Sequence, residues 1–242
     1  GNLTPGNQVG AAYIYDLSGT QLAKLVPSDG QAGDKFGYSV AVGSGRIVVG
    51  AYLDGDNGSY SGSAYIYDLN GTQLTKFTSS DNAQGDFFGE SVAIGSGRIV
   101  VGSILDDDQF NAGGAAYIFD LDGNQLAKIL PDVGSYVGHF GKSVAVGCGR
   151  IVVGAWQFNG NNYGKAYIYD LSGTQLATMT PNDFANQDKF GFSVAVGCGR
   201  IVVGSRFDDD NGQQSGSAYI FDLDGIQLAK IKASDGATND DF

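Results

Sequence analysis

The chain has 242 residues, of which 39 are glycine and 12% are aromatic, a composition typical of a turn-rich sheet protein. Its formal net charge of −12 argues against a nucleic-acid partner, because phosphate backbones are bound through Lys and Arg. No apolar run approaches the roughly 18 residues that a membrane helix needs. We therefore expect neither nucleic-acid binding nor membrane insertion.

Two segments recur along the chain. The segment Phe36–Gly50 reads Phe-Gly-Tyr-Ser-Val-Ala-Val-Gly-Ser-Gly-Arg-Ile-Val-Val-Gly, and it returns with spacings of 52, 52 and 50 at Phe88, Phe140 and Phe190. A second segment begins at Ala12 and returns at Ala64, Ala116, Ala166 and Ala218, with spacings of 52, 52, 50 and 52. A fixed period of this length predicts a repeat architecture.

Each repeat predicts four short antiparallel strands, called A to D. In the first full repeat they are Ser39–Gly43, Arg46–Gly50, Ala64–Asp68 and Gln73–Phe77. Ser-Gly joins A to B, and Asn-Gly joins C to D, where we expect the positive φ angles of a tight hairpin turn. Strand B is an unbroken Ile-Val-Val run, which suits a sheet covered on both faces. Four such strands in about 50 residues predict one blade of a β-propeller.

These motifs resemble the FG-GAP repeats of integrin-α-like propellers. The resemblance rests on Phe-Gly-x-Ser-Val-Ala, a Val-Val-Gly strand, an Asp/Asn/Gly loop and Gly-Ser-Ala-Tyr-Ile-Tyr. The linker Lys24–Asp34, Lys-x-x-x-Ser-Asp-Gly-x-x-Gly-Asp, is most similar to the bacterial variety. The resemblance implies a repeat module of a large surface protein. Integrin-type blades carry an Asp-x-Asp-x-Asp-Gly calcium loop between strands A and B, but this chain has Gly-Ser-Gly or Gly-Cys-Gly there, so that site does not carry over.

We expect one all-β repeat domain over residues 1–242, a β-propeller of about five four-stranded blades. Repeats start at 36, 88, 140 and 190, and residues 1–35 form a partial blade, so there are five C–D hairpins and four A–B hairpins. Three explanations stay open: a fragment of a longer array, a last blade that is a bare C–D hairpin, or another chain that supplies the missing strands. An open edge strand is a template for such pairing.

The acidic residues gather in the B–C loops and the linkers between repeats, which antiparallel connectivity places on one face. Carboxylates in Gly/Asn-rich loops can hold Ca²⁺, which takes six to eight oxygens. The candidate metal ligands are Asp54, Asp56, Asp106, Asp108, Asp208 and Asp210. The alternative is that these are turn residues that bond their own backbone. No cofactor is required, and Ca²⁺ is the one candidate.

The same loops vary most between repeats and carry aromatic residues. Variable loops on a rigid scaffold commonly bind ligands, and aromatic residues anchor interfaces. The candidate ligand-binding residues are Tyr60, Phe110, Trp156, Phe158, Tyr163 and Phe207. The alternative is that they fold back to cap the blade edges.

On the opposite face, an arginine opens each strand B and an aspartate ends each strand C. Because these ends are neighbours in an antiparallel pair, we expect structural charge pairs. They are Arg46 with Asp68, Arg98 with Asp120, Arg150 with Asp170, and Arg200 with Asp222. Cys148 and Cys198 lie in equivalent turns of consecutive repeats, too far apart for a disulfide, and are expected to be free thiols.

Nothing in the sequence predicts an enzyme. The chain has one histidine, His139, at a variable linker position, and no nucleophile–base pair stands out. We expect a non-enzymatic binding or adhesion module of an extracellular or virion surface protein, which recognises a protein or glycan through its acidic, aromatic loop face. One alternative is a structural unit that forms oligomers or filaments with copies of itself through unpaired blade edges. A glycan-cleaving propeller is the other.

Overall fold

The computed structural model describes residues 9–108, 113–131, 137–158, 163–183 and 187–242, and every regular element in them is a β-strand. None of these residues forms a helix that is long and apolar enough to cross a membrane. A two-stranded sheet comes first in the chain, formed by β1 (Ala12–Tyr15) and β2 (Gln21–Leu25).

Four four-stranded antiparallel sheets follow, and each is one repeat. Blade 1 contains β3 (Ser39–Gly43), β4 (Arg46–Ala51), β5 (Ser63–Tyr67) and β6 (Gln73–Phe77). Blade 2 contains β7 (Phe88–Gly95), β8 (Arg98–Ser103), β9 (Ala115–Phe119) and β10 (Gln125–Ile129). Blade 3 contains β11 (Val137–Gly147), β12 (Arg150–Phe158), β13 (Lys165–Tyr169) and β14 (Gln175–Met179). Blade 4 contains β15 (Phe190–Gly197), β16 (Arg200–Ser205), β17 (Ser217–Phe221) and β18 (Gln227–Ile231).

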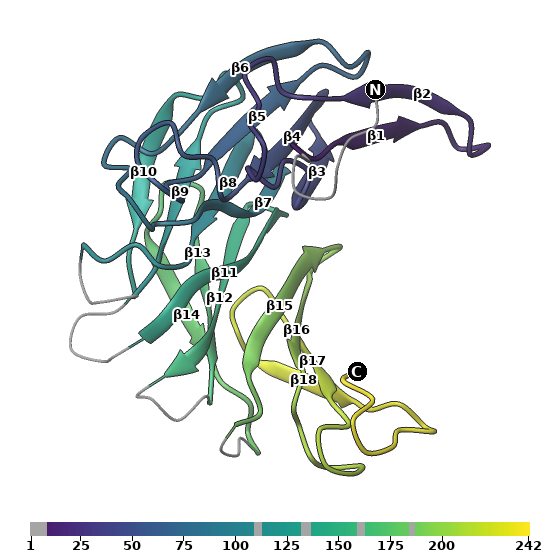
Figure 1. Ribbon diagram of the computed structural model, residues 1–242. Helices are drawn as coiled ribbons and strands as arrows, with labels where there is room; N and C mark the ends of the chain where they lie inside the picture. The colour runs from purple at the N-terminus through teal and green to yellow at the C-terminus, as the bar shows by residue number, and fades with distance from the viewer. Residues whose placement is uncertain (1–8, 109–112, 132–136, 159–162, 184–186) are drawn as a thin grey trace.

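The blades follow one another around an arc, with β1–β2 at one end and β15–β18 at the other (Figure 1). The first strand of each blade contacts the first strand of the next, so these strands line the inside of the arc. This is the expected propeller-like arrangement. Within the described residues there are five outer hairpins and four inner ones, as predicted, because β1 and β2 lack the inner strands that complete the other sheets.

The two kinds of hairpin turn differ in geometry. Ser44 (φ 50°) and Gly45 (φ 74°) both have positive φ, which gives the A–B turn the predicted tight form. In the C–D turn only Gly71 (φ 89°) has positive φ, so the expectation that the Asn-Gly pair supplies two such angles was wrong. There the Gly71 N–H donates to the Asp68 carbonyl, as in a type I turn. The strand register shifts beside this turn, between Ile66 and Tyr67, which indicates a β-bulge.

The Phe-Gly-x-Ser motif joins each blade to its neighbour. Phe88 is fully buried, and its N–H donates to the carbonyl of Ser61 in the preceding blade at 3.0 Å. The Ser39 hydroxyl donates to the Gly89 carbonyl at 2.7 Å. A Cβ at Gly50 would lie 2.0 Å from that same carbonyl oxygen, so strand B must carry glycine at this close approach.

The hydrophobic core is divided among the junctions between blades. At the first full junction, Val48, Ile66 and Phe77 of blade 1 pack against the next blade, including its Phe88 and Tyr117. Equivalent clusters join blades 2 and 3, and blades 3 and 4. A smaller one joins β1–β2 to blade 1. Each blade therefore depends on its immediate neighbours, as in other repeat proteins.

The predicted arginine–aspartate pairs were wrong. Within the described residues, none of Arg46–Asp68, Arg98–Asp120, Arg150–Asp170 and Arg200–Asp222 is an ion pair. Each aspartate accepts hydrogen bonds inside its own turn instead; Asp68 Oδ1 accepts from the backbone N–H groups of Asn70 at 2.9 Å and Thr72 at 2.8 Å.

Two of the four arginines reach the next blade. Arg98 Nε donates to the Leu171 carbonyl at 3.4 Å, and Arg150 Nε to the Leu223 carbonyl at 3.3 Å. These groups therefore connect blades rather than adjacent strands. The cysteine prediction was confirmed, because Cys148 and Cys198 are exposed free thiols.

Candidate functional site

The described parts of the loops β4–β5, β8–β9, β12–β13 and β16–β17 and of the linkers between blades lie at one end of the sheets, here called the loop face. A lysine of the outermost strand ties these segments together in blade 1. Lys76 Nζ lies 2.8 Å from Asp29 in the preceding linker, and 2.8 and 2.6 Å from Asp54 and Asp56 in the B–C loop. The Tyr65 hydroxyl donates to Asp54 at 2.9 Å, and its oxygen also lies 3.2 Å from Asp29 Oδ1.

The same arrangement, here called the lysine cluster, occurs in two more blades. In blade 2, Lys128 Nζ lies 2.8, 3.0 and 2.6 Å from Asp81, Asp106 and Asp108. In blade 4, Lys230 Nζ lies 2.8, 2.7 and 2.7 Å from Asp183, Asp208 and Asp210. The middle aspartate of each set has a side chain only 3% exposed. Its charge is therefore compensated by the ammonium and the tyrosine hydroxyl.

The pKa shifts agree with this geometry. Burial opposes the charged form of Lys128, but hydrogen bonds with Asp108, Asp81 and Asp106 raise its pKa well above the ordinary value. Burial likewise opposes ionisation of Asp81, but hydrogen bonds with Lys128 and Tyr117 lower the pKa of that carboxyl. Lys128 and Asp81 are therefore both charged near neutral pH.

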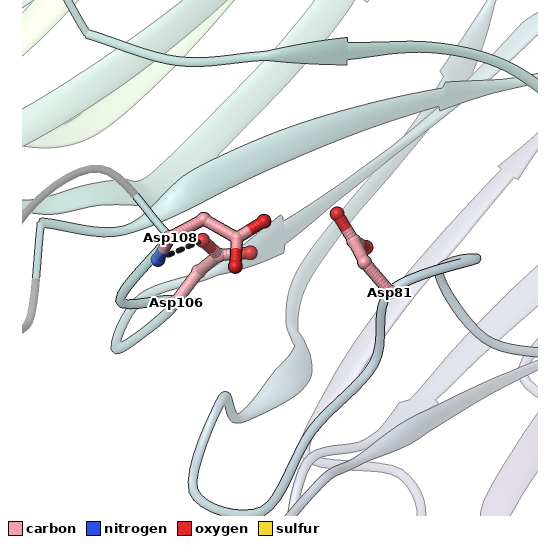
Figure 2. A group of neighbouring side chains, drawn as sticks. All are labelled: Asp81, Asp106 and Asp108. Atoms are coloured by element: carbon pink, nitrogen blue, oxygen red, sulfur yellow. Dashed lines mark hydrogen bonds between the residues drawn. The ribbon is translucent and has the colours of Figure 1, made fainter.

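The lysine cluster contains all six candidate metal ligands. In blade 2 the carboxylates of Asp81, Asp106 and Asp108 come within 4.8 Å of one another, and Figure 2 shows Asp81 approaching the other two from a separate loop. The Lys128 ammonium takes the central position among them. A calcium ion would have to displace this ammonium group, so the geometry disfavours Ca²⁺ binding. The calcium site stays a prediction.

Blade 3 lacks the cluster because its sequence has neither the lysine nor the acidic residues of the B–C loop. Thr178 takes the place of the lysine, and the loop after Trp156 carries no acidic residue. This joint loss is the signal that could have identified Lys76, Lys128 and Lys230 from sequence, where they were overlooked.

The candidate ligand-binding aromatics lie in different environments. Tyr60 is 52% exposed and contacts the edge of Phe87. Trp156 is half-buried, stacks on His139 at 4.8 Å, and has Lys189 Nζ 4.6 Å from its ring centroid. Phe207 is also half-buried. Tyr163 lies just before β13 and is half-buried. Phe110 and the side chain of Phe158 lie outside the described part of the chain.

Basic side chains link Trp156 and Phe207 into one patch. Lys189 Nζ lies 4.1 Å from the Phe207 ring centroid, and Arg206 Cζ lies 5.3 Å from it. Burial and the nearby Arg206 lower the pKa of the Lys189 ammonium. Asp241 accepts a hydrogen bond from Arg206 at 2.8 Å. We call Trp156, Lys189, Arg206 and Phe207 the basic aromatic patch, which sequence reasoning missed because it placed only acids and aromatics on the loop face.

His139 lies beneath this patch. Burial, followed by the charges of Lys142 and Lys189, lowers the pKa of its imidazole. It is therefore neutral near pH 7 and serves as a flat surface for the Trp156 ring.

A pocket of about 240 Å³ lies beside Phe207. Its lining residues are Gln187 from the linker before blade 4 and Phe207, Asp209, Gln213 and Gln214 from the β16–β17 loop. Asp209 Oδ1 accepts a hydrogen bond from the Gln214 N–H at 2.7 Å, which fixes the carboxylate. The pocket thus combines an aromatic ring with amide groups that both donate and accept hydrogen bonds.

These features define a repeat protein of propeller blades whose loop face is held together by lysine clusters. The FG-GAP repeat matches residues 20–67, 72–119, 124–169 and 174–221, well over half of the chain. The chain belongs to the FG-GAP repeat family. No curated protein matches it.

Proposed function

We propose that the chain is a non-enzymatic binding module that recognises an acidic glycan through the pocket of blade 4 and the neighbouring basic aromatic patch. The observation that carries the proposal is the pocket of about 240 Å³ that places Phe207 beside Gln187, Gln213 and Gln214. Ligand sites combine apolar or aromatic walls with a few polar groups that fix orientation. Amide side chains match sugar hydroxyls, because each amide both donates and accepts hydrogen bonds.

The charge of the ligand follows from the cations beside Phe207. Lys189 and Arg206 both lie against its ring, and burial and the Arg206 charge lower the pKa of the Lys189 ammonium. An anionic group placed near them would relieve this repulsion. A carboxylate or sulfate on a sugar suits this position.

The proposal is for binding rather than catalysis. Among the residues that line the pocket, Asp209 is the sole carboxylate, and it is engaged with the Gln214 backbone. Glycoside hydrolysis ordinarily needs two carboxyl groups on opposite sides of the scissile bond. We also place the module at an extracellular or virion surface, where acidic glycans are displayed.

A glycan array of sulfated, uronate-containing and neutral oligosaccharides tests the proposal. We expect saturable binding to acidic members, about tenfold or more weaker for Phe207→Ala and for Gln213→Ala. Binding should also weaken as salt rises, because the charged contacts are partly exposed.

Tyr60→Ala is the matched control, since Tyr60 is an exposed aromatic of the loop face outside the pocket. It should bind as the wild type does. Equal binding by Phe207→Ala and the wild type, or a response to neutral glycans alone, would contradict the proposal.

A further inference from the structure

Cys148 and Cys198 occupy the same position in the A–B turns of blades 3 and 4, and both are exposed thiols. Their backbone conformations agree closely, with φ values of 51° and 49°. Blades 1 and 2 carry Ser44 and Ser96 at this position. The distance between neighbouring turns decides whether the two thiols can react with each other.

The turns of blades 2 and 3 are in direct contact. Ser96 Oγ accepts a hydrogen bond from the Gly149 N–H at 3.3 Å. Because each of these atoms lies about 2.4 Å from the Cα of Ser96 or of Cys148, the two Cα atoms are at most about 8 Å apart. Disulfides span Cα separations of roughly 4.4–6.8 Å, which a small adjustment of two exposed turns can reach. Equivalent turns of neighbouring blades are therefore in contact, not separated as the sequence suggested.

The junction of blades 3 and 4 repeats this approach. A Cβ at Gly95 would lie 2.5 Å from the Val146 carbonyl oxygen, and a Cβ at Gly147 would lie 3.1 Å from the Val196 carbonyl oxygen. Each of these glycines comes directly before the turn position that carries serine or cysteine. The two cysteines therefore stand to each other as Ser96 stands to the next turn.

We propose that Cys148 and Cys198 form a disulfide that joins blade 3 to blade 4, with a small-molecule disulfide such as oxidised glutathione as the oxidant. The thiolate of one cysteine attacks a sulfur of the oxidant, which gives a mixed disulfide and releases one glutathione thiolate. The thiolate of the other cysteine attacks the protein sulfur of that mixed disulfide and displaces the second glutathione. The protein thiols lose two protons and two electrons, and the two glutathione molecules take them up.

The bond closes the junction that carries the basic aromatic patch. Trp156 belongs to blade 3, whereas Lys189 and Phe207 belong to the linker before blade 4 and to its β16–β17 loop. The A–B turns lie at the opposite ends of the same two sheets, so the bond holds the end of the junction that the patch does not reach. The proposal does not depend on what the patch binds, because it rests on the contacts between turns.

The test equilibrates the full chain, at low concentration, with reduced or oxidised glutathione, followed by alkylation with iodoacetamide and mass spectrometry. In the oxidised sample we expect a monomer that lacks two hydrogens and takes up no iodoacetamide, and a peptide map that links Cys148 to Cys198. Its melting temperature should exceed that of the reduced protein by about 5–10 °C, because the bond closes a loop of about 50 residues in the unfolded chain. Cys148→Ser should abolish this difference.

Two double variants test the geometry. Ser96→Cys combined with Cys198→Ser moves the two thiols to the junction of blades 2 and 3, and it should also form the intramolecular bond. Ser44→Cys combined with Cys198→Ser places the thiols on blades 1 and 3, with blade 2 between them, and it should leave both thiols open to alkylation.

Alkylation of both cysteines in the oxidised wild type, or glutathione on each of them without a bond, would overturn the proposal. Disulfide-linked dimers without the intramolecular bond would do the same. Equal bond formation by the variant with thiols on blades 1 and 3 would also contradict it, because contact between adjacent turns would then not be what brings the thiols together.

Discussion

Lys76 Nζ lies 2.8 Å from Oδ2 of Asp54, whose side chain is 3% exposed. The lysine comes from the outermost strand of blade 1 and the aspartate from the loop between its two central strands. Lys76 also contacts Asp29, so it connects β6 to the B–C loop and to the preceding linker. Without the ammonium group, the carboxylates of the loop and the linker would repel each other. The acidic composition of the loop face thus contributes to the rigidity of the scaffold.

Replacing the central lysine should destabilise the fold. We expect Lys128→Met to lower the free energy of unfolding by about 2–4 kcal/mol, because it leaves the buried Asp106 charge without its ammonium partner. Urea denaturation measures the change. Lys24→Met is the matched control, since Lys24 occupies the equivalent position in the incomplete blade and contacts Tyr13 at 5.8 Å. A change below about 0.5 kcal/mol for Lys128→Met would contradict the role of the cluster.

Calcium should have little effect on the wild-type chain. We expect no rise in melting temperature at millimolar Ca²⁺, because ammonium groups occupy the three carboxylate sets. In Lys128→Met the carboxylates of Asp81, Asp106 and Asp108 become available, so calcium should raise the melting temperature of that variant. Differential scanning calorimetry compares the two. A calcium-dependent rise in the wild type would instead support the metal sites predicted from the sequence.

Stability near blade 2 should depend on pH through Asp86. Burial, together with the charges of Asp106 and Asp107, raises the pKa of this carboxyl to about 6, although a hydrogen bond from the Ala83 N–H opposes the shift. Because the folded-state pKa is raised, the stabilisation from protonated Asp86 is complete below about pH 4 and is lost as the pH rises through 6.

Asp86→Asn removes this titration. We expect the unfolding free energy of the variant, relative to the wild type, to rise by about 1–3 kcal/mol between pH 4 and pH 7. Urea unfolding at several pH values measures the difference. Asp122→Asn, at an exposed turn position, should give a curve parallel to the wild type. A constant offset between Asp86→Asn and the wild type would show that Asp86 is not responsible.

Two glycines at the same repeat position should respond differently to substitution. A Cβ at Gly95 would lie 2.5 Å from the Val146 carbonyl oxygen of the next blade, whereas a Cβ at Gly197 would meet nothing within 4 Å. We expect Gly95→Ala to cost about 1–3 kcal/mol through overpacking. Gly197→Ala should be neutral or stabilise by up to about 1 kcal/mol. Thermal unfolding of both variants checks this, and equal effects would contradict the packing of the junctions.

Much of the fold could be predicted because each repeat contains the same strand-forming and turn-forming residues. Val-rich strands, Gly-containing turns and a constant period predicted β3 as Ser39–Gly43 and β6 as Gln73–Phe77, with the observed bounds. The C–D turn was mispredicted in detail, because Asp68 forms a side-chain-capped type I turn that Asn-Gly alone does not indicate.

The candidate site was less predictable, because its contacts join segments that are distant in the chain. Lys76 and Asp29 are 47 residues apart, and their approach depends on the stacking of one blade on the next. Lys189 meets Trp156 and Phe207 for the same reason. The prediction of the arginine pairs was wrong because strand adjacency within one blade does not show what the neighbouring blade offers. There the Leu171 carbonyl accepts a hydrogen bond from the Arg98 guanidinium.

The sequence by itself determined the repeat and the four strands of each full blade, because strand periodicity and turn chemistry are local properties. The tertiary structure decided which charges compensate one another and which aromatics lie against cations. These depend on how one blade packs on the next, since junction contacts join residues about one repeat apart. A single repeat cannot specify them without its neighbour.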